Sequence, residues 1–151
     1  MRKYVVLLAF LLCTNVAYSQ DLRTPLAFIE YQDSEGNAQR YYGVRLPSET
    51  GSPMISQQDL QNVTRVGVGA LDDDGLESQL DWFSVIGFEM AVADINGNIV
   101  ILPSDSNTFT DEQKAFINEL QQDRQFYIVN TKAIGPDEKE RKIAPMRVVV
   151  E

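Results

Sequence analysis

The sequence of 151 residues contains no histidine and a single cysteine. Histidine is the commonest general base of enzymes and a common metal ligand, so the usual residue for both roles is missing. A single cysteine excludes an internal disulfide and a metal centre built from several thiolates. An enzyme would then need paired carboxylates or a serine with a lysine, and no spacing in the sequence indicates either. We therefore predict that the protein is not an enzyme and has no cofactor.

Long apolar runs are also scarce. The N-terminal run, Val5–Leu12, is too short to cross a bilayer comfortably, which argues against the alternative of a membrane anchor. It follows two basic residues and precedes Ala17 and Ser19, small residues at the spacing of a cleavage site. We therefore expect residues 1–19 to be a secretory signal peptide that is removed before Gln20.

The expected mature chain, residues 20–151, has a suitable length for a single domain with its own core. It would contain no cysteine, because Cys13 leaves with the signal peptide. Loss of Arg2 and Lys3 changes the formal net charge from −9 to −11. Such an acidic surface favours solubility and argues against nucleic acid or anionic lipid as the partner.

Short apolar runs separated by turn residues predict an all-β protein, an antiparallel β-sandwich with one short helix. Glu35-Gly36-Asn37 and Asn96-Gly97 are typical of hairpin turns. A loop is predicted over residues 47–61, with a helical turn at Ser56–Leu60. The predicted strands are Leu26–Tyr31, Gln39–Leu46, Val63–Leu71, Leu80–Ala93, Ile99–Leu102, Gln125–Ile134 and Ile143–Val150.

The predicted strand Leu80–Ala93 is the longest and supplies the predicted core. Strict alternation places one apolar stripe on one of its faces, composed of Trp82, Ile86, Phe88, Met90 and Val92. In the predicted strand Val63–Leu71, Gly67 and Gly69 share one face. Two glycines there predict close approach by a neighbouring element, and the alternative is an exposed, weakly packed face.

The predicted helix begins after Thr110. Thr110 and Gln113 have the spacing of a capping box, in which each residue bonds the backbone N–H of the other. Phe116, Ile117 and Leu120 then fall on one face, which we expect to pack on a sheet.

Asp72, Asp73 and Asp74 are three adjacent carboxylates that stand directly before Gly75. Adjacent carboxylates could bind calcium, which prefers several oxygen ligands. The cluster lacks the ligand spacing of a dedicated calcium loop, and aspartate followed by glycine is typical of a solvated turn. The alternative function is therefore a calcium-binding or small-ligand-binding module of the periplasm.

Three segments resemble a known family: FSVIGFEM at Phe83–Met90, NTFTDEQKAFINEL at Asn107–Leu120 and FYIVNTKAIGPDEKERKI at Phe126–Ile143. In this order they resemble the C-terminal domain of GldM, the gliding-motility protein of the type IX secretion apparatus. The third segment is the most specific, because it joins an aromatic strand to K-A-x-G-P-D and then to R-K. The resemblance is strongest over residues 82–150.

The resemblance implies an immunoglobulin-like β-sandwich in the periplasm, where GldM domains form part of a rod between an inner-membrane motor and an outer-membrane-associated ring. It implies envelope or secretion-apparatus proteins as partners and brings no catalytic residues. GldM proteins carry a membrane helix and further domains before this one, whereas this chain is predicted to be a signal peptide and one domain. We therefore expect an exported interaction domain, in the periplasm or alternatively outside the cell, which docks partners through an open sheet edge.

Overall fold

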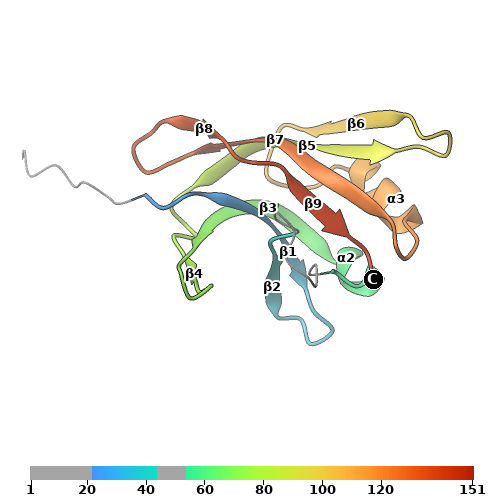
Figure 1. Cartoon of the computed structure of the whole chain (residues 1–151), viewed down its shortest axis with the longest axis horizontal. Coiled ribbons are helices and arrows are strands. Elements are labelled where there is room, and N and C mark those ends of the chain that lie inside the picture. The colour runs from blue at the N-terminus through green and yellow to red at the C-terminus, as the bar shows by residue number, and fades with distance from the viewer. Residues whose placement is uncertain (1–21, 44–53) are drawn as a thin grey trace, which may run out of the picture.

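The computed structural model describes residues 22–43 and 54–151. They form two antiparallel sheets that pack on each other (Figure 1), and the predicted β-sandwich is confirmed. The predicted signal peptide, residues 1–19, lies outside the described residues, as does the end of the second predicted strand.

The strands have the following bounds. The first sheet contains, in spatial order, β2 (Ala38–Tyr41), β1 (Leu26–Gln32), β3 (Val63–Leu71) and β4 (Glu77–Ser78). The second sheet contains β6 (Ile99–Ser104), β5 (Ser84–Ala93), β7 (Gln125–Ile134) and β8 (Glu140–Lys142), with β9 (Met146–Val149) also paired to β7. The helices of the described part are α2 (Gln57–Leu60) and α3 (Asp111–Glu119). The last predicted strand begins only after Pro145, which has no N–H to donate to a ladder.

The core fills the space between the two sheets. Ile29 of β1 and Val66 of β3 belong to one cluster with Phe88 of β5 and Phe126 of β7. Ile117 of α3 joins this cluster, as expected for the apolar face of the helix. Burial of each large apolar side chain contributes roughly 1.5–3 kcal/mol, so this cluster is the main source of stability.

The predicted capping box of α3 is present. The Gln113 N–H donates to Thr110 Oγ1 at 3.2 Å, and the Thr110 N–H donates to Gln113 Oε1 at 2.9 Å. Gln113 is also fully buried, and its Nε2 donates to the carbonyl oxygen of Leu102 in β6 at 2.8 Å. One side chain therefore caps α3 and attaches it to β6.

The predicted strand Leu80–Ala93 begins only at Ser84, and its predicted core face is wrong in the first half. Trp82 is 40% exposed and Ile86 is 39% exposed, whereas Phe83, from the opposite predicted face, is buried. The second half is as predicted, with buried Phe88, Met90 and Val92.

An irregular register between β5 and β7 causes the difference at Ile86. Val85 and Gly87 lie opposite two consecutive residues of β7, so Ile86 is an extra residue in β5. A second shift, between Gly87 and Glu89, gives β7 one residue more, and Asn130 there has a φ of 51°. An extra residue moves the following side chains to the opposite face, because successive residues of a strand alternate.

The two glycines of β3 permit close packing, as predicted. A Cβ at Gly67 would lie 2.2 Å from Phe28 Cζ, and a Cβ at Gly69 would lie 2.8 Å from Leu80 Cδ2. Phe28 is fully buried, so the alternative of an exposed, weakly packed face is wrong.

A seam joins Ile55 to the end of β9. The Ile55 N–H donates to the Val149 carbonyl oxygen at 3.0 Å, and the Glu151 N–H donates to the Ile55 carbonyl oxygen at 2.9 Å. Ser56 then caps α2, since its Oγ accepts from the Asp59 N–H at 3.0 Å. The predicted helical turn in this region is therefore confirmed.

Gly67→Ala should lower the free energy of unfolding by roughly 1–3 kcal/mol, because the new methyl group overlaps the buried ring of Phe28. Gly69→Ala should have a smaller effect, since its methyl group meets the end of the flexible Leu80 side chain. Urea denaturation of both variants measures the two losses. Wild-type stability in Gly67→Ala would contradict the close packing described here.

Candidate interaction site

The three acidic residues Asp72, Asp73 and Asp74 lie in the hairpin turn between β3 and β4. Asp72 Oδ1 accepts from the Leu76 N–H at 2.6 Å, and Gly75 has the positive φ of 77° that the turn requires. Among residues 22–43 and 54–151, no group of three acidic, histidine or cysteine side chains is placed to hold a metal ion. Calcium binding by the three aspartates stays a prediction from the sequence.

Two other hairpins contain the same turn. Asp33 Oδ1 accepts from the backbone N–H groups two and four positions later, each at 2.9 Å. Asp94 Oδ1 accepts from the equivalent groups at 2.8 and 2.9 Å. In each turn the bond from the fourth residue is the main reason why the pKa of the aspartate is lowered. The bonds within the turn therefore explain why an aspartate stands at position 72, and no bound ligand is needed to explain it.

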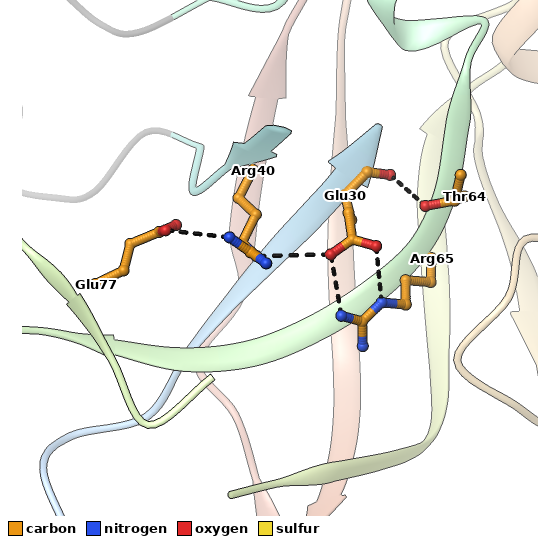
Figure 2. A network of polar contacts seen from close by, with 5 residues as sticks. All are labelled: Glu30, Arg40, Thr64, Arg65 and Glu77. Atoms are coloured by element: carbon orange, nitrogen blue, oxygen red, sulfur yellow. Dashed lines mark hydrogen bonds and ion pairs between the residues drawn. The ribbon is translucent and has the colours of Figure 1, made fainter. Parts of the chain in front are cut away.

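A polar network covers the outer face of the first sheet (Figure 2). Arg65 of β3 donates twice to the Glu30 carboxylate of β1, from Nε to Oε1 at 3.1 Å and from Nη2 to Oε2 at 3.0 Å. Arg40 of β2 lies 3.5 Å from the same carboxylate and donates to Glu77 of β4 at 3.2 Å. Thr64 Oγ1 donates to the Glu30 carbonyl oxygen at 3.1 Å. The network therefore connects all four strands of this sheet.

The same arginines cover Phe28. The Cζ atom of Arg40 lies 5.6 Å from the centre of the Phe28 ring, and the Cζ atom of Arg65 lies 5.8 Å from it. Tyr42 packs on the ring with the two centroids 5.4 Å apart. A guanidinium over an aromatic face is attracted by the ring, so these contacts hold the side chains in place. The network stabilises the sheet, and the carboxylate at its centre is fully engaged in bonding.

The third family segment builds the turn between β7 and β8. Arg141 donates from Nη1 and Nη2 to the Asp137 carboxylate at 2.7 and 2.5 Å, which holds the pKa of that carboxyl well below its usual range. A Cβ at Gly135 would lie 2.5 Å from Arg141 Nη1, so glycine makes room for the guanidinium. Glu138 takes the positive φ of this turn, at 62°. The motif therefore has a structural role.

β6 is an edge strand, because it pairs with β5 alone among the described strands. The Asp94 N–H donates to the Asn98 carbonyl oxygen at 2.9 Å and closes the hairpin. This bond makes Ala93 and Ile99 an opposed pair whose backbone groups point away from each other, and every second pair repeats that arrangement. The N–H and C=O groups of Ile99 and Ile101 therefore point away from β5, to the open side of β6.

No charge protects this edge. The segment Ile99–Ser104 contains no charged residue, and Ile99 and Ile101 are 67% and 46% exposed. Pro103 follows the same alternation, so its ring nitrogen faces the open side, where no ladder bond is lost. Proteins usually protect sheet edges with charges, prolines, bulges or covering elements. Here Pro103 protects only the far end of β6, beyond Ile99 and Ile101. An uncharged apolar edge is therefore a candidate for binding another chain.

A pocket of about 290 Å³ opens beside this edge, between β6 and α3. Its apolar lining consists of Val92, Val100, Leu102, Ala115 and Phe116, and its carboxylates are Asp94, Glu112 and Glu119. The bond from Gln113 to Leu102 holds α3 in this position. We call the open backbone of residues 99–101, together with this pocket, the β6 site.

Sequence reasoning expected docking at an open edge but did not identify β6. It paired Ile99–Leu102 with the preceding strand, which is correct. Whether the other side of β6 is free depends on where the chain goes next. After Ser104 the chain crosses to the first sheet, where the Asn107 carbonyl oxygen accepts from the Val66 N–H at 2.8 Å. The available signal was the lack of charge along Ile99–Ser104.

The ion pairs of the first sheet generate a pH prediction. The hydrogen bond from Arg65 lowers the pKa of Glu30 from its ordinary value of 4.5. The resulting stability is fully present above that value and is lost as the pH falls through the lower pKa of the folded state. Glu30→Gln should therefore lower the free energy of unfolding by roughly 1–3 kcal/mol at pH 7, and this loss should shrink at pH 3.

Urea denaturation at both pH values measures the effect of Glu30→Gln. Glu138→Gln, at an exposed turn, is the matched control and should leave stability close to that of the wild type at both. A loss in Glu30→Gln that is equal at pH 7 and pH 3 would show that the charge of Glu30 is not what matters.

A family model described as the GldM C-terminal domain matches residues 25–151. The match reaches well beyond residues 82–150, where the sequence resemblance was strongest, and it includes β1 and β2. No curated protein matches the chain. Within residues 22–43 and 54–151, no helix has the length and apolar character that crossing a membrane requires. The chain belongs to the GldM C-terminal domain family.

Proposed function

We propose that this protein is an exported interaction domain that binds other proteins of the cell envelope and catalyses no reaction. Family membership over residues 25–151 is the observation that carries the proposal, because the GldM family belongs to the gliding and secretion apparatus. The predicted signal peptide, residues 1–19, supports export, and the periplasm is the proposed location.

The distribution of bonding groups supports a binding role. The charged side chains of the first sheet bond to each other, so that surface has few strong groups left for a ligand. β2 of the first sheet and β6 of the second sheet are both edge strands, but β2 contains Arg40 whereas β6 contains no charged residue. A partner that adds a strand gains main-chain hydrogen bonds along the edge and specificity from neighbouring side-chain pockets. The lack of histidine supports a role that is not catalytic.

Affinity capture tests the proposed function. The full gene is expressed in the native host with an affinity tag between the predicted signal peptide and Leu22, because the chain after β9 is bonded to Ile55. Envelope proteins recovered with the tagged protein are identified by mass spectrometry. We expect gliding or type IX secretion components to be enriched over an unrelated exported protein that carries the same tag.

Circular dichroism of the recovered protein serves as the control for folding. If the protein is folded and enriches no component of either apparatus, the assignment to that machinery is wrong. Localisation of the tagged protein in the cytoplasm would contradict the export part of the proposal.

A further inference from the structure

We propose that the β6 site binds an extended, basic segment of a partner protein. The segment adds a strand beside β6 and inserts an apolar side chain into the pocket under α3. This inference rests on the proposed function as an interaction domain, and it specifies the surface and the chemistry of the partner.

The backbone of β6 provides the first part of the recognition. The N–H and C=O groups of Ile99 and Ile101 point outward, two residues apart, which is the spacing at which an added strand forms its bonds. The side chains of β6 itself are uncharged, so a strand can pair with β6 without removing water from an ionised group of that strand. Pro103 has no N–H to offer and limits the added strand at that end.

The pocket provides the second part. Val100 and Leu102 of β6 point toward it, and every second side chain of an added strand would point to the same side. A volume of about 290 Å³ is at the lower limit for a free organic ligand, since such pockets begin near ~300 Å³. The pocket therefore suits one large apolar side chain that is delivered by a bound strand.

Charge selects the kind of partner. In the part of the chain that the structure describes, the pocket lining includes Asp94, Glu112 and Glu119 but no lysine or arginine. Glu112 stands in the first turn of α3, where the helix dipole favours it, but Glu119 stands in the last turn, where the dipole opposes a negative charge. The presence of a glutamate at position 119 is therefore not explained by a contribution to helix stability. A segment with lysine or arginine beside its apolar residue complements the three carboxylates, whereas a second copy of this acidic chain would be repelled.

Two synthetic peptides test the proposal directly. Both are ten residues long with a central alternation of leucine and threonine, and they carry two lysines or two glutamates at each end. Binding to the protein expressed from the full gene is measured by fluorescence anisotropy at low salt. We expect the basic peptide to bind at least tenfold more tightly than the acidic one. In nuclear magnetic resonance spectra it should shift the amide signals of Ile99, Val100 and Ile101.

Ile99→Pro removes one outward N–H without removing a bond to β5, and it should weaken the basic peptide at least tenfold. The matched control is Ala38→Pro, because the bond from the Asp33 N–H to the Asn37 carbonyl oxygen gives Ala38 the equivalent outward position in the other hairpin. This control should change binding less than twofold. Equal effects of the two variants, or signal shifts confined to β2, would overturn the proposal.

A second pair of variants tests the charge and remains informative if Ile99→Pro fails to fold. Glu112→Gln with Glu119→Gln should reduce the preference for the basic peptide several-fold. Glu35→Gln with Glu138→Gln changes the net charge equally at two distant turns and should leave the preference intact. An unchanged preference in the first variant would overturn the electrostatic part of the proposal. If the wild type self-associates and Ile99→Pro abolishes this association, the partner at the β6 site is a second copy of the chain and not a basic segment.

These outcomes are separate from those of the proposed function. If affinity capture enriches envelope components equally with wild type and Ile99→Pro, the protein is an interaction domain that uses another surface. If the basic peptide binds as expected but capture enriches no gliding or secretion component, the β6 site stands and its assignment to that apparatus fails.

Discussion

The buried side chain of Gln113 determines how the helix, the edge strand and the pocket lie together. Its amide serves as an acceptor for the start of α3 and as a donor to the Leu102 carbonyl oxygen. A buried amide without partners would cost free energy, so its bonds specify one arrangement of α3 on β6. In that arrangement no described strand pairs with the outward side of β6, and two glutamates of α3 lie beside the pocket.

The two sheets differ in how their outer apolar side chains are covered. On the first sheet a large aromatic residue, Phe28, lies on the outer face, and Arg40 and Arg65 cover it while bonding to acidic neighbours. On the second sheet, Ile99 and Ile101 have no such cover. Covering Phe28 uses charges of the first sheet, whereas β6 of the second sheet exposes Ile99 and Ile101.

Sequence reasoning predicted those features that depend on neighbouring residues. The capping box of Thr110, the hairpin at Asn96-Gly97 and the full extent of β3 and β7 all follow from residues a few positions apart. It failed at Trp82, because that residue lies in a turn before β5 and not in the strand. It failed at Ile86, because an alternating pattern assumes an unbroken ladder and this extra residue breaks it. A bulge depends on the partner strand, which is distant in sequence. The β6 site also depends on residues distant in sequence, because a strand lies at an edge only when no other strand pairs with its second side.

The seam at Ile55 has a kinetic consequence. This residue pairs with a segment almost one hundred positions later, so the sandwich closes there only when the end of β9 has arrived. Contacts between such distant residues form slowly, because a long loop must be closed first. A chain that is still being synthesised would therefore remain open at α2, with the hydrophobic groups of the half-built core accessible to chaperones.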